Sequence, residues 1–414
     1  MKTTKGRSSR RRIPSFEAVE ARRLMTTVPG GASGLVAAAS HGRPAGMRQG
    51  GATQVEVQAL RTPAGARGRL SPEVVRALDA EIDRAVAQDG LPSAAVMITI
   101  PGSRSYVAVR GEADLRTGRA RGAAMPFRIA SITKSFTATA VLQLADRGKL
   151  SLDDPLAKWY PDFPHADSIT VDDLLRMRSG IPDSLGHDLL GEYYADPLIR
   201  ITPQESIDKA ASMAHDFQPA DRETVYNNLN YIFLQEIVAR VAGRDLGAQI
   251  RRSILRPLGL TTTSYPTGDR LPGPLRGYSL DAEAGRPVDK TVLNPAVAGG
   301  AGAMISTLRD LTVYARALGT GTLLKPETQA ARLQGETLAG APDFVKYGEG
   351  VEMIGPFVGH NGTIFGFSSE MFYLPALRAT IVVDVNRLDV DDVSRSTPLF
   401  LSLARIAFPE YVLW

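Results

Sequence analysis

The chain has 414 residues, 43% of them hydrophobic and 22% charged, which suits one large globular domain or two closely packed ones. Its basic residues are concentrated at the start, because the first 70 residues hold 13 Lys and Arg against 3 Asp and Glu, whereas the remainder holds 35 basic and 41 acidic residues. The mildly acidic body argues against charge-driven binding of nucleic acid, the absence of cysteine excludes disulfides, and no apolar run is long enough to span a membrane.

The N-terminal 70 residues differ from the rest of the chain in composition. Residues 1–40 form a basic leader in which a modest apolar segment and small residues follow a positive region, an imperfect secretory signal. We therefore expect export to the periplasm, the cell wall or the medium, and the alternative is a disordered basic tail. Residues 41–70 are rich in Gly, Arg, Ala and Pro and are expected to form a disordered linker, which leaves 71–414 as the folded domain.

Hydrophobic periodicity and capping residues predict the elements of this domain in chain order. We expect a helix opened by Ser71 and Pro72; strands over 94–100 and 106–110; a helix over 131–147 ended by Gly148; helices that begin at the capping boxes of Thr170 and Thr202; a helix over 230–242; strands near 357–362, 368–374 and 379–385; and a helix over 398–407 capped by Thr397. This order predicts an α+β fold, an antiparallel sheet flanked by helices, with a mostly helical lobe at roughly 150–290.

A Ser-x-x-Lys motif lies at the start of the helix predicted over 131–147. Residues three apart share one helix face, so the ammonium of Lys134 reaches the hydroxyl of Ser131. A serine hydroxyl becomes a nucleophile when a neighbouring base takes its proton, and a lysine can be that base only where its surroundings lower its pKa. The alternative is that Ser131 merely caps the helix. A second copy, Ser206 with Lys209, falls inside a predicted polar helix, where no terminus exposes the serine, so we do not expect it to be catalytic.

Two further motifs occur once each in the chain. A Tyr-x-Asn motif, Tyr226 to Asn228, directly precedes an amphipathic helix; a Lys–Tyr pair can shuttle the serine proton to the leaving group, and Asn228 can bind a substrate amide. A His-x-Gly motif, His360 to Gly362, lies on a late strand that can present a cation to a substrate, while Gly362 leaves room for close backbone approach. Taken alone, Tyr226 also fits a core tyrosine and His360 a structural histidine.

In order and spacing, the three motifs resemble those of the penicillin-recognising serine hydrolases, which include D-alanyl-D-alanine carboxypeptidases, class C β-lactamases and related esterases. The intervals from Ser131 to Tyr226 and from Tyr226 to His360 are 95 and 134 residues, both typical of that family. The likeness covers roughly residues 75–410 and includes the segments 127–144, 150–155, 169–181, 299–307 and 347–350. It implies an antiparallel sheet of five to seven strands with helices on both faces, and a site between the sheet and a helical lobe.

Carried over residue by residue, the resemblance implies Ser131 as the nucleophile, with Lys134 and Tyr226 as its base system. It implies that the backbone N–H groups of Ser131 and Thr363 form an oxyanion hole. The residues implied as substrate contacts are Asn228, His360, Asn361, Gly362 and Thr363.

The sequence departs from the family pattern near the predicted pocket. His360 replaces the lysine of the β-lactamase-type Lys-Thr-Gly, which favours carboxypeptidases and esterases. Asn361 stands where many carboxypeptidases have threonine, which removes a hydroxyl donor for a substrate carboxylate. The usual Pro-Gly ahead of Tyr226 is Pro219-Ala220, followed by a longer loop, so the substrate is the weakest of these inferences.

We therefore expect a D-alanyl-D-alanine carboxypeptidase-like enzyme that forms an acyl-serine intermediate on peptidoglycan peptides. An esterase or a β-lactamase on the same scaffold is the alternative, because one fold hosts several acyl-transfer chemistries. A non-catalytic protein that binds peptidoglycan fragments is a second alternative, which the joint presence of Ser131, Lys134 and Tyr226 disfavours. The expected partner is a small-molecule or peptide substrate, with no metal and no cofactor, and the oligomeric state stays open.

Overall fold

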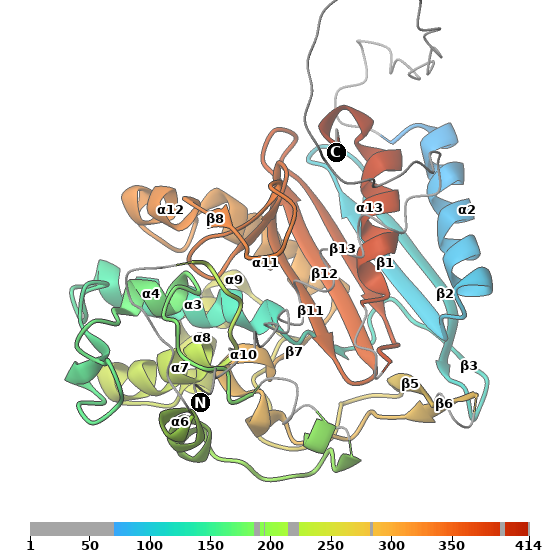
Figure 1. Ribbon diagram of the computed structural model, residues 1–414. Coiled ribbons are helices and arrows are strands. Elements are labelled where there is room, and N and C mark those ends of the chain that lie inside the picture. The colour runs from blue at the N-terminus through green and yellow to red at the C-terminus, as the bar shows by residue number, and fades with distance from the viewer. Residues whose placement is uncertain are drawn as a thin grey trace, which may run out of the picture.

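A computed structural model describes residues 70–185, 191–193, 195–213, 223–281, 285–389 and 394–412 (Figure 1). The predicted leader at 1–40 and the predicted linker at 41–70, apart from Leu70, lie outside the described residues. Export of the protein therefore stays a prediction from composition.

A nine-stranded antiparallel sheet forms the centre of the domain (Figure 1), in the order β3-β2-β1-β13-β12-β11-β10-β9-β8. Its strands are β1 (Ser93–Thr99), β2 (Tyr106–Asp114), β3 (Arg119–Ala120), β8 (Glu336–Thr337), β9 (Val345–Tyr347), β10 (Glu352–Ile354), β11 (Phe357–Ile364), β12 (Phe367–Leu374) and β13 (Ala379–Val385). β1 pairs with β13, with Ala94 opposite Val385, so early and late parts of the chain meet inside one sheet.

The helices of the described residues fall on both faces of this sheet. They are α2 (Pro72–Gln88), α3 (Ile132–Asp146), α4 (Val171–Leu175), α6 (Pro203–Ser212), α7 (Leu229–Ala242), α8 (Leu246–Ile250), α9 (Arg256–Leu258), α10 (Gly299–Gly302), α11 (Leu308–Thr320), α12 (Pro326–Arg332) and α13 (Ser396–Ala407). A π-helical segment, Arg251–Leu255, joins α8 to α9. Two short ribbons pair β4 (Phe127–Arg128) with β7 (Ile305–Ser306), and β5 (Tyr278–Asp281) with β6 (Arg286–Asp289).

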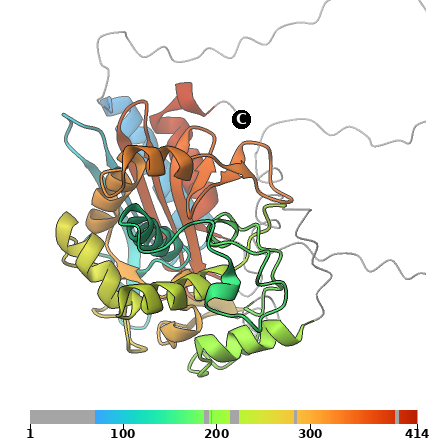
Figure 2. The same ribbon diagram turned by 90° about the vertical axis from the view of Figure 1, so that its left-hand side faces the viewer.

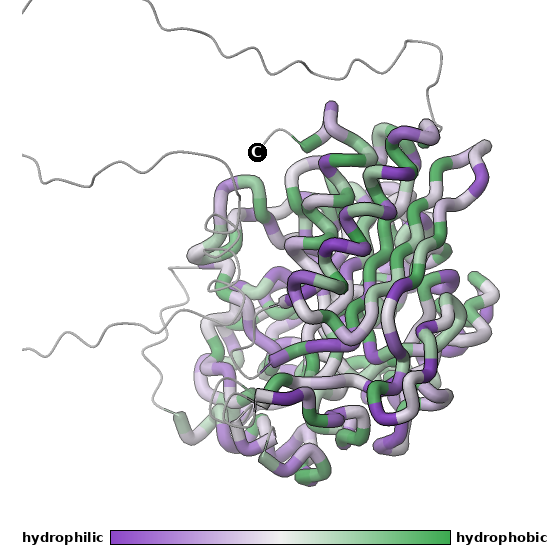
Figure 3. The backbone as a smooth tube through the Cα atoms, turned by 90° about the vertical axis from the view of Figure 1, so that its right-hand side faces the viewer, coloured by the Kyte–Doolittle hydropathy of each residue, from purple (hydrophilic) through white to green (hydrophobic). Residues whose placement is uncertain are grey.

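The sheet separates two hydrophobic cores. On one face, α2 and α13 cover β1, β12 and β13 with side chains such as Ile82 and Phe400. On the other face α11 packs on β1, β12 and β13, and α3 packs on β11; Figure 2 looks onto the remaining helices with the sheet behind them. Every residue of β12 and β13 is buried, because both faces of the central strands are covered. Figure 3 shows the side of the domain that lies to the right in Figure 1, where hydrophobic and hydrophilic residues are interspersed along the helices and strands.

The structure confirms the predicted α+β fold and corrects two details of it. Ser71 caps α2, and the capping boxes of Thr170 and Thr202 are both complete. The predicted start of the last helix is wrong, because α13 begins at Ser396, while the hydroxyl of Thr397 donates to the buried carboxylate of Glu370 at 2.6 Å instead of capping the helix. The sheet also exceeds the expected five to seven strands, since very short strands extend it at its edges.

Candidate active site

Ser131 stands at the N-terminal end of α3, directly after a strained turn. The N–H of Ile129 donates to the carbonyl of Met304 at 3.0 Å, which continues the β4–β7 ribbon up to the turn. Ala130 then takes a left-handed backbone with a φ of 44°, a conformation that side-chain-bearing residues rarely adopt. The hydroxyl of Ser131 makes no capping hydrogen bond to α3. Helix capping therefore does not account for this serine, and the strained turn presents its hydroxyl to Lys134.

Lys134 lies one helical turn further along α3, inside the core. Its Nζ donates to Ser131 Oγ at 2.8 Å, to Asn228 Oδ1 at 2.8 Å and to the carbonyl of Ala301 at 3.0 Å. An ammonium has three donors, so these acceptors use all of them. Every residue of α3 from Ile132 to Leu144 is buried, which keeps bulk water away from this side chain. When Lys134 is neutral, the same contact lets its nitrogen accept the proton of Ser131.

Tyr226 places its ring against this lysine. The Lys134 Nζ lies 4.6 Å from the centroid of the Tyr226 ring, within the range of a cation–π contact. The ring also meets Tyr347 edge-on, at 5.9 Å between centroids, and Tyr226 is buried. The N–H of Val225 donates to the carbonyl of Met177 at 2.9 Å and so fixes the segment before α7. The structure thus brings Ser131, Lys134 and Tyr226 together from chain segments 95 residues apart.

Asn228 precedes α7 and joins Lys134 to a buried carboxyl group. While its Oδ1 accepts from Lys134, its backbone N–H and its Nδ2 donate to Asp183 Oδ2 at 3.1 and 3.3 Å. Burial raises the pKa of Asp183 above its usual value, and the hydrogen bond from the Asn228 backbone and the charge of Lys134 act in the opposite direction. Sequence reasoning missed Asp183. The binding of a substrate amide by Asn228 stays a prediction, and both ends of its amide are already engaged.

His360 lies on β11, and its environment corrects the expectation of a cation. The side chain is fully buried; its Nε2 is 3.1 Å from the hydroxyl of Tyr347, and its Nδ1 is 2.7 Å from the carbonyl of Asn361. Burial, reinforced by the positive charge of Lys134, lowers the pKa of His360 to about 3. The imidazole is therefore neutral at ordinary pH, and it offers no positive charge to a substrate. Tyr347, its partner, was not among the predicted site residues.

The next residues of β11 bring this strand against the nucleophile turn. The N–H of Asn361 donates to the buried carboxyl of Glu352 at 3.2 Å, and burial raises the pKa of Glu352 to about 7. The Asn361 Oδ1 is buried and has no hydrogen-bond partner among the described residues. Gly362 faces the carbonyl of Ile129, and Thr363 follows, half-buried. The oxyanion hole implied for the N–H groups of Ser131 and Thr363 stays a prediction.

Comparison with known proteins decides which family this arrangement represents. A family model described as Beta-lactamase matches residues 78–404, well over half of the chain. The chain belongs to the beta-lactamase family.

The relatives of this beta-lactamase family member cover several named activities. Esterase EstB of Burkholderia gladioli is 29% identical over 335 residues, which are 73% of this chain and 81% of the esterase. The protein PbpX of Bacillus subtilis (strain 168) is 30% identical over 198 residues, which are 48% of this chain, and the match spans only 47% of PbpX.

Solved structures of two enzymes are similar to this one. The D-stereospecific amidohydrolase from Streptomyces sp. has a TM-score of 0.71 at 28% identity, over 80% of this chain and 98% of that chain. The D-amino acid amidase from Ochrobactrum anthropi SV3, complexed with L-phenylalanine, has a TM-score of 0.72 at 26% identity, over 81% of this chain and 99% of that chain. These relatives include an esterase and amide-cleaving enzymes, so the family relationship supports a serine hydrolase without distinguishing between acyl substrates.

The second Ser-x-x-Lys copy has none of these features. Ser206 is buried in the middle of α6, and Lys209 lies on its exposed face. Of the two copies, the one at Ser131 is therefore the candidate for catalysis in this beta-lactamase family member.

Within the described part of the chain, no group of three His, Asp or Glu side chains is placed to hold a metal ion, and no helix is long and apolar enough to cross a membrane.

Proposed function

We propose that this protein hydrolyses esters or amides of small D-amino acids through an acyl-serine intermediate. Ser131 Oγ attacks the carbonyl carbon of the substrate, while its proton passes to neutral Lys134. The C–O or C–N bond to the leaving group then breaks, and the leaving group takes up the proton with the help of Lys134 and Tyr226. A water molecule attacks the acyl-serine ester in the second half of the reaction, which releases the acid and restores the serine.

The observation that carries this proposal is the contact of Lys134 Nζ with Ser131 Oγ at 2.8 Å, at the end of a buried helix. It supports an acyl-serine chemistry and disfavours a non-catalytic binding protein, which needs no such pair. The environment of His360 favours substrates without a free carboxylate, such as amino-acid amides and esters. A neutral, fully buried imidazole supplies no positive charge for the terminal carboxylate of a peptide. We propose the D-configuration for the substrate because the structure is similar to the D-amino acid amidase and the D-stereospecific amidohydrolase.

A D-alanyl-D-alanine carboxypeptidase is the second candidate. It is supported by the order and spacing of the three motifs, which resemble those of D-alanyl-D-alanine carboxypeptidases. A β-lactamase on the same scaffold is a further outcome to be measured. These activities differ in whether the substrate carries a free carboxylate next to the scissile bond.

The test compares kcat/KM for D-phenylalanine amide, a D-alanine p-nitrophenyl ester, a peptide ending in D-Ala-D-Ala and a chromogenic cephalosporin. We expect the amide and the ester to be cleaved at least about tenfold more efficiently than the peptide, and the L-enantiomers to react poorly. The Ser131→Ala variant must lose every activity, whereas Ser206→Ala must retain it. Preference for the peptide would establish the second candidate, and full activity of Ser131→Ala would overturn the nucleophile.

A further inference from the structure

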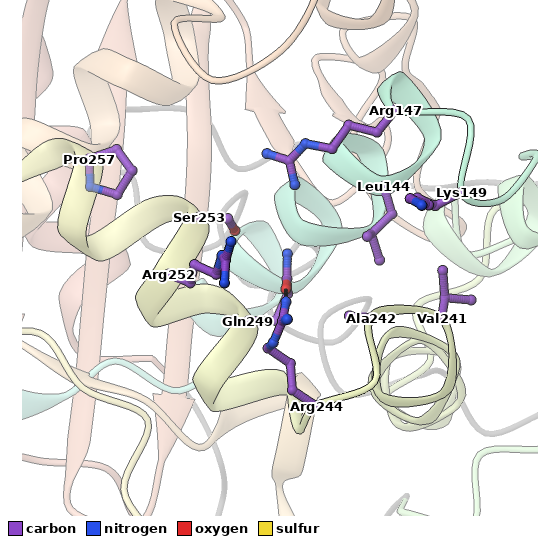
Figure 4. A pocket seen from close by; sticks show the side chains of 10 residues that line it. All are labelled: Leu144, Arg147, Lys149, Val241, Ala242, Arg244, Gln249, Arg252, Ser253 and Pro257. Carbon is purple, nitrogen blue, oxygen red and sulfur yellow. Dashed lines mark hydrogen bonds between the residues drawn. The ribbon is translucent and has the colours of Figure 1, made fainter.

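A basic pocket of about 560 Å³ lies at the opposite end of α3 from Ser131 (Figure 4). Leu144, Arg147 and Lys149 approach it from the end of α3, and Arg244, Gln249 and Arg252 from the segment that runs from α7 into α9. An adjoining hollow shares two of these arginines and adds two more. We call the six cations the basic cluster: Arg147, Lys149, Arg244, Arg251, Arg252 and Arg256.

The charges of the basic cluster are not compensated by acidic side chains. Among the described residues, none of the six forms an ion pair. The carboxylates next to it in sequence accept bonds elsewhere, Asp146 from the N–H of Lys325 at 2.8 Å and Asp245 from the N–H of Ala248 at 2.8 Å. Six like charges on one patch of a mildly acidic body repel one another, and a bound anion would relieve that repulsion.

A buried hydroxyl in the same pocket gives an independent indication of a ligand. Ser253 lines the pocket, is only 8% exposed, and its Oγ has no hydrogen-bond partner among the described residues. Leaving a buried hydroxyl unsatisfied costs about 1–3 kcal/mol, which a ligand oxygen would recover once rotation of the Ser253 side chain turned the hydroxyl into the pocket. Ser253 belongs to the π-helical segment Arg251–Leu255, and such segments occur frequently at functional sites.

We propose that this pocket binds a small phosphate-bearing anion. Guanidinium groups bind phosphate oxygens in pairs of parallel hydrogen bonds, and the Ser253 hydroxyl supplies a further donor. The partial negative charges at the C-terminal ends of α3 and α7, about half an elementary charge each, oppose an anion, but six full positive charges exceed them. The volume lies in the range of small-molecule sites, and Leu144, Val241 and Pro257 provide apolar walls for an organic part.

The basic pocket is separate from the site of the proposed hydrolysis. The 15 residues of α3, at about 1.5 Å each, place it roughly 22 Å from Ser131 along the helix. It contains none of the predicted catalytic or substrate-binding residues. Binding there can therefore be measured whether or not the proposed function is correct.

Isothermal titration of the full chain with inorganic triphosphate tests the proposal. We expect binding that weakens as salt is added, because the attraction is electrostatic. The double variant Arg147→Ala, Arg252→Ala should weaken binding at least about thirtyfold, and Ser253→Ala about tenfold, as for one hydrogen bond to a charged group. The double variant Arg104→Ala, Arg119→Ala, which removes two exposed arginines, one in the β1–β2 turn and one in β3, serves as the matched control for net charge and should change the affinity less than about twofold. Thermal melting establishes that each variant is folded.

Vesicles distinguish a free phosphate from a lipid headgroup as the source of the anion. Sedimentation with phosphatidylglycerol vesicles, lost in the Arg147→Ala, Arg252→Ala variant and absent with phosphatidylcholine, would identify a headgroup; triphosphate binding without vesicle binding would identify a soluble phosphate. Either result supports the pocket as a phosphate site. The proposal would be overturned if neither probe binds, if the control double variant weakens binding as much as Arg147→Ala, Arg252→Ala does, or if the protein binds only duplex DNA.

Discussion

The carbonyl oxygen of Ile129 occupies the space that a Cβ atom on Gly362 would need. Ile129 comes two residues before Ser131, and Gly362 comes one residue before Thr363. This backbone contact therefore sets the separation of the two N–H groups from which an oxyanion hole is predicted. The absence of a side chain at position 362 is a requirement of the contact between β11 and the nucleophile turn.

Substitution of Gly362 by alanine should move β11 away from Ser131. We expect Gly362→Ala to lower the free energy of unfolding by about 1–3 kcal/mol, the usual cost of overpacking. It should lower kcat about a hundredfold, because a displacement near 1 Å is enough for such a loss. Gly268→Ala is the control, since a Cβ there meets no atom within 4 Å. Unfolding curves and steady-state rates measure both effects, and a normal kcat for Gly362→Ala would show that the contact does not position the site.

Removal of the Lys134 ammonium should abolish activation of the serine. Lys134→Met keeps the length of the buried side chain but removes the base, so we expect labelling of Ser131 by a fluorophosphonate probe to slow about a thousandfold. Lys209→Met makes the same change in the second Ser-x-x-Lys motif and should leave labelling unchanged. Circular dichroism checks that both variants are folded. Rapid labelling of folded Lys134→Met would mean that another group is the base.

His360 should make the protein sensitive to acid. The unfolded chain binds a proton at His360 below about pH 6.5, whereas the pKa of about 3 keeps the folded imidazole neutral, so stability is lost as the pH falls from 6.5 towards 3. The His360→Gln variant lacks this titration. Its free energy of unfolding should therefore fall by roughly 3 kcal/mol less than that of the parent protein when the pH is lowered from 7 to 4. Denaturant unfolding at the two pH values measures the difference. His165→Gln, at an exposed histidine, is the control, and equal acid sensitivity of parent and His360→Gln would contradict the prediction.

Glu352 should lower the stability of the protein as the pH rises, the opposite of the effect of His360. Its pKa in the folded protein, about 7, lies above the usual 4.5, so the folded state holds a proton that the unfolded state has released. The stabilisation contributed by this proton is present in full below pH 4.5 and is lost as the pH rises through 7. Glu352→Gln keeps an acceptor for the Asn361 N–H. In this variant the free energy of unfolding should no longer fall by the amount on the order of 1–3 kcal/mol that the parent protein loses between pH 5 and pH 8. Thermal melting of the parent and the variant across this pH range measures the effect. If the melting temperature depends on pH equally in both, Glu352 is not the source of the pH dependence.

Features with a local cause could be predicted from the sequence. The capping boxes of Thr170 and Thr202 begin helices because the side chains that satisfy the first N–H groups lie within three residues. The Lys134–Ser131 contact follows equally from their spacing of three on one helix. The start of α13 was missed because the hydroxyl of Thr397, a good cap by residue type, is used by Glu370, 27 residues away in the chain.

The parts of the site that escaped prediction depend on long-range contacts. The carbonyl of Ala301 accepts from Lys134 across 167 residues, and Asp183 holds Asn228 across 45. The neutral state of His360 follows from burial beside Tyr347, which no local pattern reveals. The basic pocket is equally non-local, since Arg147 and Arg252 come from segments about a hundred residues apart.

The pairing of β1 with β13 has a consequence for how the protein is made. Ala94 meets Val385, and the same late strand separates β1 from β12, so the two parts of the sheet stay unconnected until residue 385 has left the ribosome. Such distant pairing folds slowly, and the exposed edges of β1 and β12 can meanwhile pair with other chains. A nascent chain stalled before β13 should therefore be inactive and bound by chaperones, even though Ser131, Lys134 and Tyr226 have all been synthesised.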